Sequence, residues 1–241
     1  MKIYSSLLTI ALALLFFSPQ SFAQMFSVGE TRGPAPSSTS YLRAGVSPLM
    51  FEFMGVQNTG PNTSQLALDN TAFYIGFESP GVELGITLAN GLTGLDEQAL
   101  FDLNFTLSNR FLLINKRGFL AGIPIQLHSS LTNVNNDRTE DNFSQTNFGA
   151  GGGAFFTLRF SEKILFSNEI TPGYGFSNSS GGFFGGSLFY VKAKSRLNFL
   201  RILNDRSVSV GYDFNFKSFD IDDDFYDFDL TSHTITLAIS L

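Results

Sequence analysis

The sequence contains no cysteine, no tryptophan and only two histidines. Without cysteine there are no disulfide bonds, thiolate metal sites, cysteine nucleophiles or lipid anchors on an amino-terminal cysteine. Charged residues make up only 15% of the chain, which has a net charge of −6. Because the basic residues form no run that would follow a phosphate backbone, nucleic acid is not expected as a partner. No cofactor and no metal site are predicted.

What is abundant is apolar and aromatic. The 241 residues are 43% hydrophobic and include 28 phenylalanines and 23 glycines. This composition is too apolar for a disordered chain, and the length fits one folding unit. Phenylalanine is typical of pleated, half-buried surfaces, and it would have to form any aromatic girdle together with tyrosine.

The amino terminus has the three parts of a secretory signal peptide. Lys2 supplies the positive charge, residues 7–17 the apolar core, and Ser21-Phe22-Ala23 a small-x-small cleavage site. A transmembrane anchor would need about 20 apolar residues, and this run is shorter. Residues 1–23 are therefore predicted to be a cleaved signal peptide. Residues 24–40, rich in Gly, Pro, Ser and Thr, are predicted to be a flexible leader.

The stretch from residue 207 to residue 241 shows a period of two, which predicts two long strands. Apolar residues in its first half are Val208, Val210, Tyr212, Phe214 and Phe216, and those in its second half are Ile235, Leu237, Ile239 and Leu241. The alternate positions hold mostly polar or small residues. No amphipathic helix is predicted that could cover the apolar face of a soluble sheet. A closed barrel with lipid outside and a polar lumen fits this pattern better.

The same pattern predicts about ten antiparallel strands across residues 41–241, with eight or twelve as alternatives. Long connections are expected at 56–70, 133–146, 177–185 and 220–229, one of medium length at 90–98, and short ones at 80–81, 115–117, 161–162 and 204–206. Outer-membrane barrels combine an even strand number with short periplasmic turns and long extracellular loops. We therefore predict a closed, up-and-down transmembrane β-barrel. A soluble all-β fold is the alternative, but its loops would not be expected to alternate so regularly.

Tight turns fix the pairing of neighbouring strands. They predict that Glu78 lies opposite Glu83, a like-charge pair that requires either a register shift or basic side chains across the lumen. They also predict Asn104 opposite His128, and Arg196 opposite Asn215.

The alternation predicts which charged side chains face the lumen. They are Glu78, Glu83, Asp102, Arg159, Glu169, Lys192, Lys194, Arg196, Asp213 and Lys217. About ten strands make a barrel only slightly wider than one whose interior is filled by side chains. A cross-lumen network of ion pairs is the favoured interpretation. The alternative is a narrow anion-selective channel with Lys192, Lys194 and Arg196 as its selectivity element.

Catalytic signals are weak, and an enzyme is not expected. His128 is predicted to point inward near the outer rim, with Asp102 on the neighbouring strand, where the pair would orient a water for hydrolysis. Omptins, which are ten-stranded proteases, are similar in placing acidic residues and a histidine at the rim. This chain has no second acidic pair, so a lumen histidine bonded to Asn104 is favoured. His233 is expected at the lipid interface.

The long connections carry acidic and aromatic residues. Asp220, Asp222 and Asp224 look like the start of a calcium loop, but Phe225 replaces its turn glycine and Thr231 its glutamate. A solvated acidic loop is therefore favoured over a site for a divalent cation. Aromatic residues expected in mobile outer loops are Phe143, Phe183, Phe184, Phe225, Tyr226 and Phe228. The glycine runs at 149–153 and 181–186 are expected to permit barrel bending and loop mobility.

The signal peptide, alternating strands, loop pattern and final segment Thr234–Leu241 resemble small outer-membrane β-barrels of Gram-negative bacteria, in particular the PorT-like barrel group of Bacteroidota. This resemblance implies residence in the outer membrane and a last strand that the barrel-assembly machinery recognises, with Leu241 in place of the usual terminal aromatic. The expected role is structural, or the binding of a surface ligand or partner. A narrow channel and, more remotely, a hydrolase are the alternatives.

Overall fold

The computed structural model describes residues 39–54, 66–94, 98–136, 141–179, 186–221 and 227–241. All of these belong to one compact unit, Pro34–Leu241. The predicted signal peptide and all but the end of the leader lie outside the described residues.

The described chain is almost entirely β-strand. The strands are β1 (Tyr41–Phe53), β2 (Leu68–Ser79), β3 (Val82–Ala89), β4 (Gln98–Lys116), β5 (Phe119–Asn136), β6 (Asp141–Gly152), β7 (Ala154–Arg159), β8 (Ile164–Ser179), β9 (Gly186–Leu203), β10 (Arg206–Ile221) and β11 (Phe228–Ser240). The described residues also include a 3-10 turn, η2 (Gly91–Thr93), which is capped by the Asn90 side chain. Among the described residues, no helix is long and apolar enough to cross a membrane.

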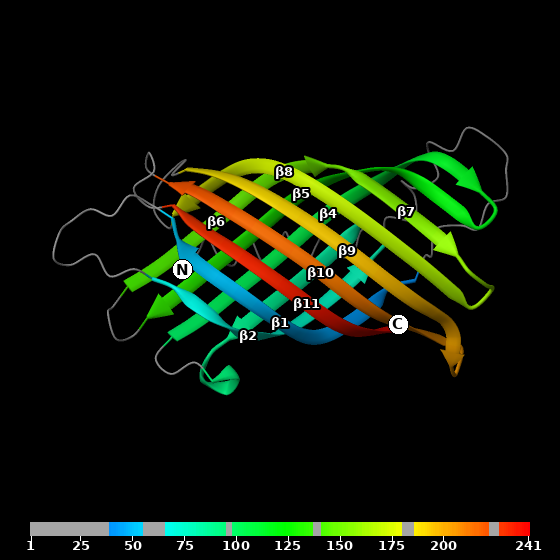
Figure 1. The fold of residues 1–241 in the computed structure, drawn as a ribbon, viewed down its shortest axis with the longest axis horizontal. Helices are drawn as coiled ribbons and strands as arrows, with labels where there is room; N and C mark the ends of the chain where they lie inside the picture. Colours follow the sequence, from blue (N-terminus) through cyan, green and yellow to red (C-terminus); the bar gives the residue numbers. More distant parts are fainter. Residues whose placement is uncertain (1–38, 55–65, 95–97, 137–140, 180–185, 222–226) are drawn as a thin grey trace, which may run out of the picture. The chain divides into compact units, whose positions relative to one another are not determined.

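The strands close into a ring of antiparallel pairs. Apart from β6 and β7, which both lie between β5 and β8, each strand pairs with its sequence neighbour. The first strand pairs with the last, from Tyr41 opposite Ser240 to Phe53 opposite Phe228. Figure 1 shows this closure as the blue strand β1 lying beside the red strand β11. A closed ring leaves no strand edge with unpaired main-chain groups. The predicted closed, antiparallel barrel is confirmed.

Strands β6 and β7 occupy one place in the ring. Both lie between β5 and β8, and the register of β6 on β5, with Ile125 opposite Gly152, continues into β7, with Gly122 opposite Phe155. The interruption at Gly153 has a local cause. Pro124 on β5 and Pro172 on β8 flank this point, and proline has no main-chain N–H with which to continue the hydrogen-bond ladder. The Gly153 N–H still donates to the Pro124 carbonyl at 3.2 Å. The ring therefore has ten strand positions, as predicted.

The outer wall is apolar. Outward positions leave large hydrophobic side chains exposed, as with Ile235 and Leu237 at 56% and 64%. Their neighbours Thr234 and Thr236 are buried in the lumen. Phe214 also points outward, since Asp213 beside it is buried in the lumen. The alternation predicted for the last two strands is therefore correct.

The two ends of the barrel differ in their connections. At one end, which we call the turn end, Pro80-Gly81, Arg117-Gly118 and Asn204-Asp205 link strands in two residues, and residues 160–163 link β7 to β8. The opposite end, which we call the loop end, carries the remaining connections. One of these is shorter than predicted, because β5 and β6 stay paired as far as Asn136 and Asp141. The predicted loop at 133–146 is therefore mostly strand.

Two predicted registers are wrong, because each hairpin has a tight turn different from the predicted one together with a bulge. Lys116 lies opposite Phe119, and a register shift between Leu112 and Ile114 restores the alternation. Consequently His128 lies opposite Thr106 rather than Asn104.

The second error lies between β9 and β10. The turn is Asn204-Asp205 rather than Asp205-Arg206, and a further shift between Arg206 and Val208 places Gly211, not Asn215, opposite Arg196. The prediction for the hairpin of β2 and β3 is correct, because Glu78 does lie opposite Glu83.

Candidate functional site: the filled lumen

The inward side chains divide the lumen into two regions along the barrel axis. Inward positions near the loop end are mostly apolar, whereas charged side chains lie in the middle and toward the turn end. We call the first region the apolar cluster and the second the charged network.

The apolar cluster closes the loop end of the lumen. Its buried members are Leu49, Phe51, Leu66, Leu68, Ala72, Ala89, Leu100, Val134, Phe143, Leu188, Tyr190, Phe219, Phe228 and Leu230. The Phe51 ring stacks on Phe228 with centroids 4.9 Å apart, and Phe143 packs edge-on against Phe51 at 4.9 Å. Rings at such distances add to the stabilisation that their buried area provides. Phe143 and Phe228, which were predicted in mobile outer loops, instead fill the barrel interior.

The charged network begins directly below the apolar cluster at Asp102. This carboxylate receives the Lys217 ammonium at 2.7 Å, the Thr132 hydroxyl at 2.7 Å and the Asn104 amide at 2.5 Å. Asp102 and Lys217 are 6% and 4% exposed. Burial of two such charges is tolerable only when hydrogen bonds of this kind satisfy them.

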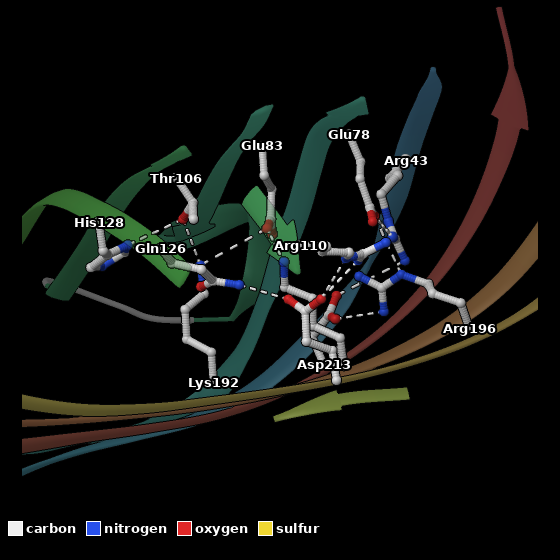
Figure 2. Close-up of polar contacts among 12 residues, drawn as sticks. Arg43, Glu78, Glu83, Thr106, Arg110, Gln126, His128, Lys192, Arg196 and Asp213 are labelled. Atoms are coloured by element: carbon white, nitrogen blue, oxygen red, sulfur yellow. Dashed lines mark hydrogen bonds and ion pairs between the residues drawn. The ribbon is translucent and has the colours of Figure 1, made fainter. Parts of the chain in front are cut away.

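The next layer is centred on Glu83. Its carboxylate contacts the Lys194 ammonium directly and lies 4.0 Å from that of Lys192. Lys192 also donates to the Thr106 hydroxyl at 2.8 Å, and that hydroxyl lies 3.3 Å from Nδ1 of His128. Figure 2 shows Lys192 reaching across the lumen toward Thr106 and Glu83.

The densest group of charges lies toward the turn end. Nη1 of Arg196 is 2.5 Å from Asp213, and its Nε is 3.3 Å from Glu78. Arg43 contacts Glu78, lies 4.0 Å from Asp213 and donates to Thr236 at 2.5 Å. The two guanidinium groups thus meet two carboxylates in a buried cluster (Figure 2).

This cluster explains two features of the sequence. The like-charge pair of Glu78 and Glu83 is neutralised by Arg43 on the neighbouring strand β1 and by Lys194 from across the lumen, and not by a shift of register. Gly211 lies under the two guanidiniums, where a Cβ atom would collide with Arg43 and come within 3.1 Å of Arg196. A larger residue at position 211 would displace the cluster.

The last group lies nearest the turn end. Arg110 pairs with Glu169 at 2.8 Å, and Gln126 donates to the other oxygen of Glu169 at 2.6 Å. The Arg110 side chain is 47% exposed and Glu169 is 6% exposed. The guanidinium of Arg110 also lies 5.3 Å from the centre of the Phe155 ring. Solvent at the turn end therefore reaches one partner of this pair.

The structure brings nine of the ten predicted lumen charges into these groups. The exception is Arg159, which is exposed at the end of β7 and takes part in no ion pair among the described residues. Arg159 occupies one of the inward alternate positions of β7, but it lies beyond the charged side chains that fill the lumen. The network also contains Arg43 and Arg110, which the sequence reasoning missed. Both occupy the same alternate positions as the inward residues of their strands, so the alternation along β1 and β4 could have identified them.

His128 and Asp102 do not form a catalytic pair. His128 is 1% exposed, bonds to Thr106 and packs against the Tyr190 ring with centroids 5.0 Å apart. Asp102 lies opposite Thr132, four residues along β5 from His128. His233 points outward from the middle of β11 and shares a 2.8 Å hydrogen bond with Tyr212.

The predicted cation site lies mostly outside the described residues, which exclude Asp222 and Asp224. Asp220 is exposed and accepts a hydrogen bond from Ser187 at 3.2 Å. Among the described residues, no group of three or more His, Cys, Asp or Glu side chains is arranged to hold a metal ion.

No protein-family model and no curated protein sequence matches the chain. Among solved structures, it is similar to the outer membrane protease OmpT from Escherichia coli, at 11% identity and a TM-score of 0.48, over 88% of this chain and 98% of that one. It is also similar to Ail, the attachment invasion locus protein of Yersinia pestis, at 11% identity and a TM-score of 0.28, over 84% and 98% of the two chains. A third likeness is to the toluene transporter TbuX of Ralstonia pickettii, at 9% identity and a TM-score of 0.27, over 85% and 90%.

Proposed function

We propose that the protein is an integral outer-membrane β-barrel with a permanently filled lumen, and that its role is structural or is carried out by its outer loops. The observation that carries the proposal is the two-layer filling, in which an apolar cluster lies above a charged network. Side chains from several strands meet in both layers, and this filling supports a lumen that is closed to solutes.

The outer wall supports the membrane location. In lipid, every main-chain polar group must be satisfied within the protein, and a closed ring of antiparallel strands achieves this. The exposed apolar side chains lie on the outward faces of the same strands. Lipid is the partner that fits them, with the barrel-assembly machinery as the partner during insertion. Membership of the PorT-like group stays a prediction from the sequence.

The channel alternative is disfavoured by the contacts of its proposed selectivity element. Lys192, Lys194 and Arg196 all lie within ion-pair distance of carboxylates, and their side chains are 7%, 11% and 7% exposed. A selectivity element must instead meet ions in water.

Planar-bilayer recording tests the proposal. Protein refolded in detergent and shown to be folded by heat-modifiable mobility is expected to give no unitary conductance steps. A triple variant, Lys192→Gln/Lys194→Gln/Arg196→Gln, is the matched comparison. Stable steps in the wild type whose ion selectivity changes in this variant would overturn the filled-lumen proposal and establish the channel.

A further inference from the structure

The exposed charges outside the lumen are separated by sign between the two ends of the barrel. At the loop end, the described residues include the exposed carboxylates of Glu52, Asp69 and Asp220 and no exposed lysine or arginine. The cations of the described chain that lie outside the charged network are all exposed at the turn end. They are Lys116, Arg117, Arg159, Lys163, Arg201 and Arg206. The chain as a whole has a net charge of −6, so its composition does not account for a positive end.

These six residues, which we call the cationic arc, follow one another around the rim. They lie at three connections, which link β4 to β5, β7 to β8 and β9 to β10. Main-chain hydrogen bonds join the three connections. The Arg159 N–H donates to the Gly118 carbonyl at 2.8 Å, and the Leu200 N–H donates to the Lys163 carbonyl at 2.8 Å. Figure 1 shows the connections after β7 and β9 at the same end of the barrel.

The cationic arc has no counter-ions within the described part of the chain. None of its side chains forms an ion pair there, whereas each cation of the charged network lies within 4.0 Å of a carboxylate. Glu162 and Asp205 lie in the same connections, so six cations stand against two carboxylates. Because the arc is exposed, water can solvate this excess, but a surface of negative charge would be attracted to it.

Large apolar side chains are exposed between the cations. Leu113, Phe160 and Ile202 are 69%, 66% and 54% exposed. Phe160 directly follows a cation of the arc, as Ile202 does, and Leu113 lies three residues before Lys116. Apolar and basic side chains that alternate in this way suit the boundary between hydrocarbon and lipid headgroups. There the apolar groups enter the hydrocarbon, while the cationic ends of lysine and arginine reach the phosphates.

We propose that the cationic arc binds the phosphate groups of anionic phospholipids in the leaflet at the turn end. The inference rests on the proposed membrane location and adds a specific lipid contact to it. Anionic lipids attract basic segments that lie at the membrane surface. The exposed carboxylates of the loop end would repel the same lipids, so the contact is confined to one leaflet.

Electron spin resonance of spin-labelled lipids tests the contact. The full chain is refolded into phosphatidylcholine vesicles that contain a trace of spin-labelled phosphatidylglycerol or, in a parallel sample, spin-labelled phosphatidylcholine. The fraction of each label that is immobilised at the barrel gives their relative association. Phosphatidylglycerol is expected to associate about twofold more strongly at low salt, and this preference should disappear in about 1 M sodium chloride.

Two sets of substitutions should move the preference in opposite directions. Lys116→Gln/Arg117→Gln/Lys163→Gln removes most of the excess charge and should lower the preference for phosphatidylglycerol to nearly one. Glu162→Gln/Asp205→Asn neutralises the carboxylates of the same connections and should raise it. Asparagine tolerates the left-handed backbone of position 205, where φ is 63°. Heat-modifiable mobility establishes that each variant is folded. Equal preferences in the wild type and both variants would overturn the proposal.

Sodium phosphate distinguishes the lipid from the free ion. At equal ionic strength it should displace no more labelled phosphatidylglycerol than sodium chloride does. A larger displacement by phosphate would show that the arc is a site for the free ion, and would overturn the proposal.

The inference and the proposed function fail separately. If neither label is immobilised, the membrane location itself is wrong. If both labels are immobilised equally at low salt, only the cationic arc is refuted. Conductance steps in planar bilayers would overturn the filled lumen and leave the lipid preference standing.

Discussion

The two regions of the lumen are built by the same strands and the same alternation, yet their side chains are stabilised in different ways. In the apolar cluster, Phe51 and Phe228 are stabilised by burial, to which many neighbouring side chains contribute. In the charged network, Arg196 and Asp213 need specific partners at specific distances. The lumen therefore has one region that should tolerate substitution and one that should not, and the two follow each other along the barrel axis. Removing one side chain from each should expose the difference.

The largest effect is expected from Arg196→Met. It leaves Asp213 with Arg43 at 4.0 Å as its remaining cation, and Glu78 with Arg43 alone. Loss of one partner from a buried ion pair costs about 3–5 kcal/mol. The free energy of unfolding in urea, measured on protein refolded into lipid vesicles, checks this value.

The double variant Arg196→Met/Asp213→Leu sharpens the test. Replacing both members of a buried pair by apolar groups is often close to neutral, so the double variant should recover at least about half of the loss. Simple addition of the two single losses would show that the pair does not act as a unit. The exposed Arg159→Met is the control, with an expected change within about 0.5 kcal/mol.

A somewhat smaller effect is expected from Phe51→Ala in the apolar cluster. Truncating a buried phenylalanine costs about 3 kcal/mol or more, depending on how far the neighbours collapse into the space. Because the charged network below is unchanged, the variant should stay silent in planar bilayers. Conductance in Phe51→Ala would mean that the cluster alone seals the lumen. Phe51→Leu, which keeps most of the volume, should lose less than about 1.5 kcal/mol.

Much of the fold followed from the alternation of the sequence. The period of two in residues 207–241 was enough to predict the strands, their outward faces and a closed barrel, because polarity alternates strictly wherever one face meets lipid. The inward parity also identified most of the lumen charges. Arg43 was missed because Pro48 made β1 look irregular, although its register on β11 continues on both sides of that residue.

The remaining errors concern pairing across strands, which parity alone does not determine. The bulges near Leu113 and Ser207 shift two hairpins, and neither has a distinctive residue type. In the first hairpin, the turn at Arg117-Gly118 and the bulge near Leu113 together place His128 opposite Thr106 rather than Asn104. The apolar cluster was missed for another reason. Inward phenylalanines such as Phe143 interrupt the alternation near the loop end, so their segments resemble irregular loops.

The smallest effect is expected at the boundary between the two regions, from Thr132→Val. Thr132 lies one inward step from Val134 of the apolar cluster, and its hydroxyl donates to Asp102 at 2.7 Å. The substitution keeps the shape and removes one hydrogen bond to a carboxylate, which costs about 1.5–3 kcal/mol for a charged acceptor. Lys217 and Asn104 continue to bond Asp102, so a loss near the lower value is expected in urea unfolding.

The same substitution made in the double variant Asp102→Leu/Lys217→Met shows whether Thr132 belongs to the apolar cluster or to the charged network. With the ion pair gone, the Thr132 hydroxyl loses its acceptor in a buried place, and valine becomes the better residue there. Thr132→Val should therefore change sign and stabilise the double variant. If it remains destabilising by the same amount, the hydroxyl acts through packing rather than through Asp102, and the boundary lies one layer closer to the turn end.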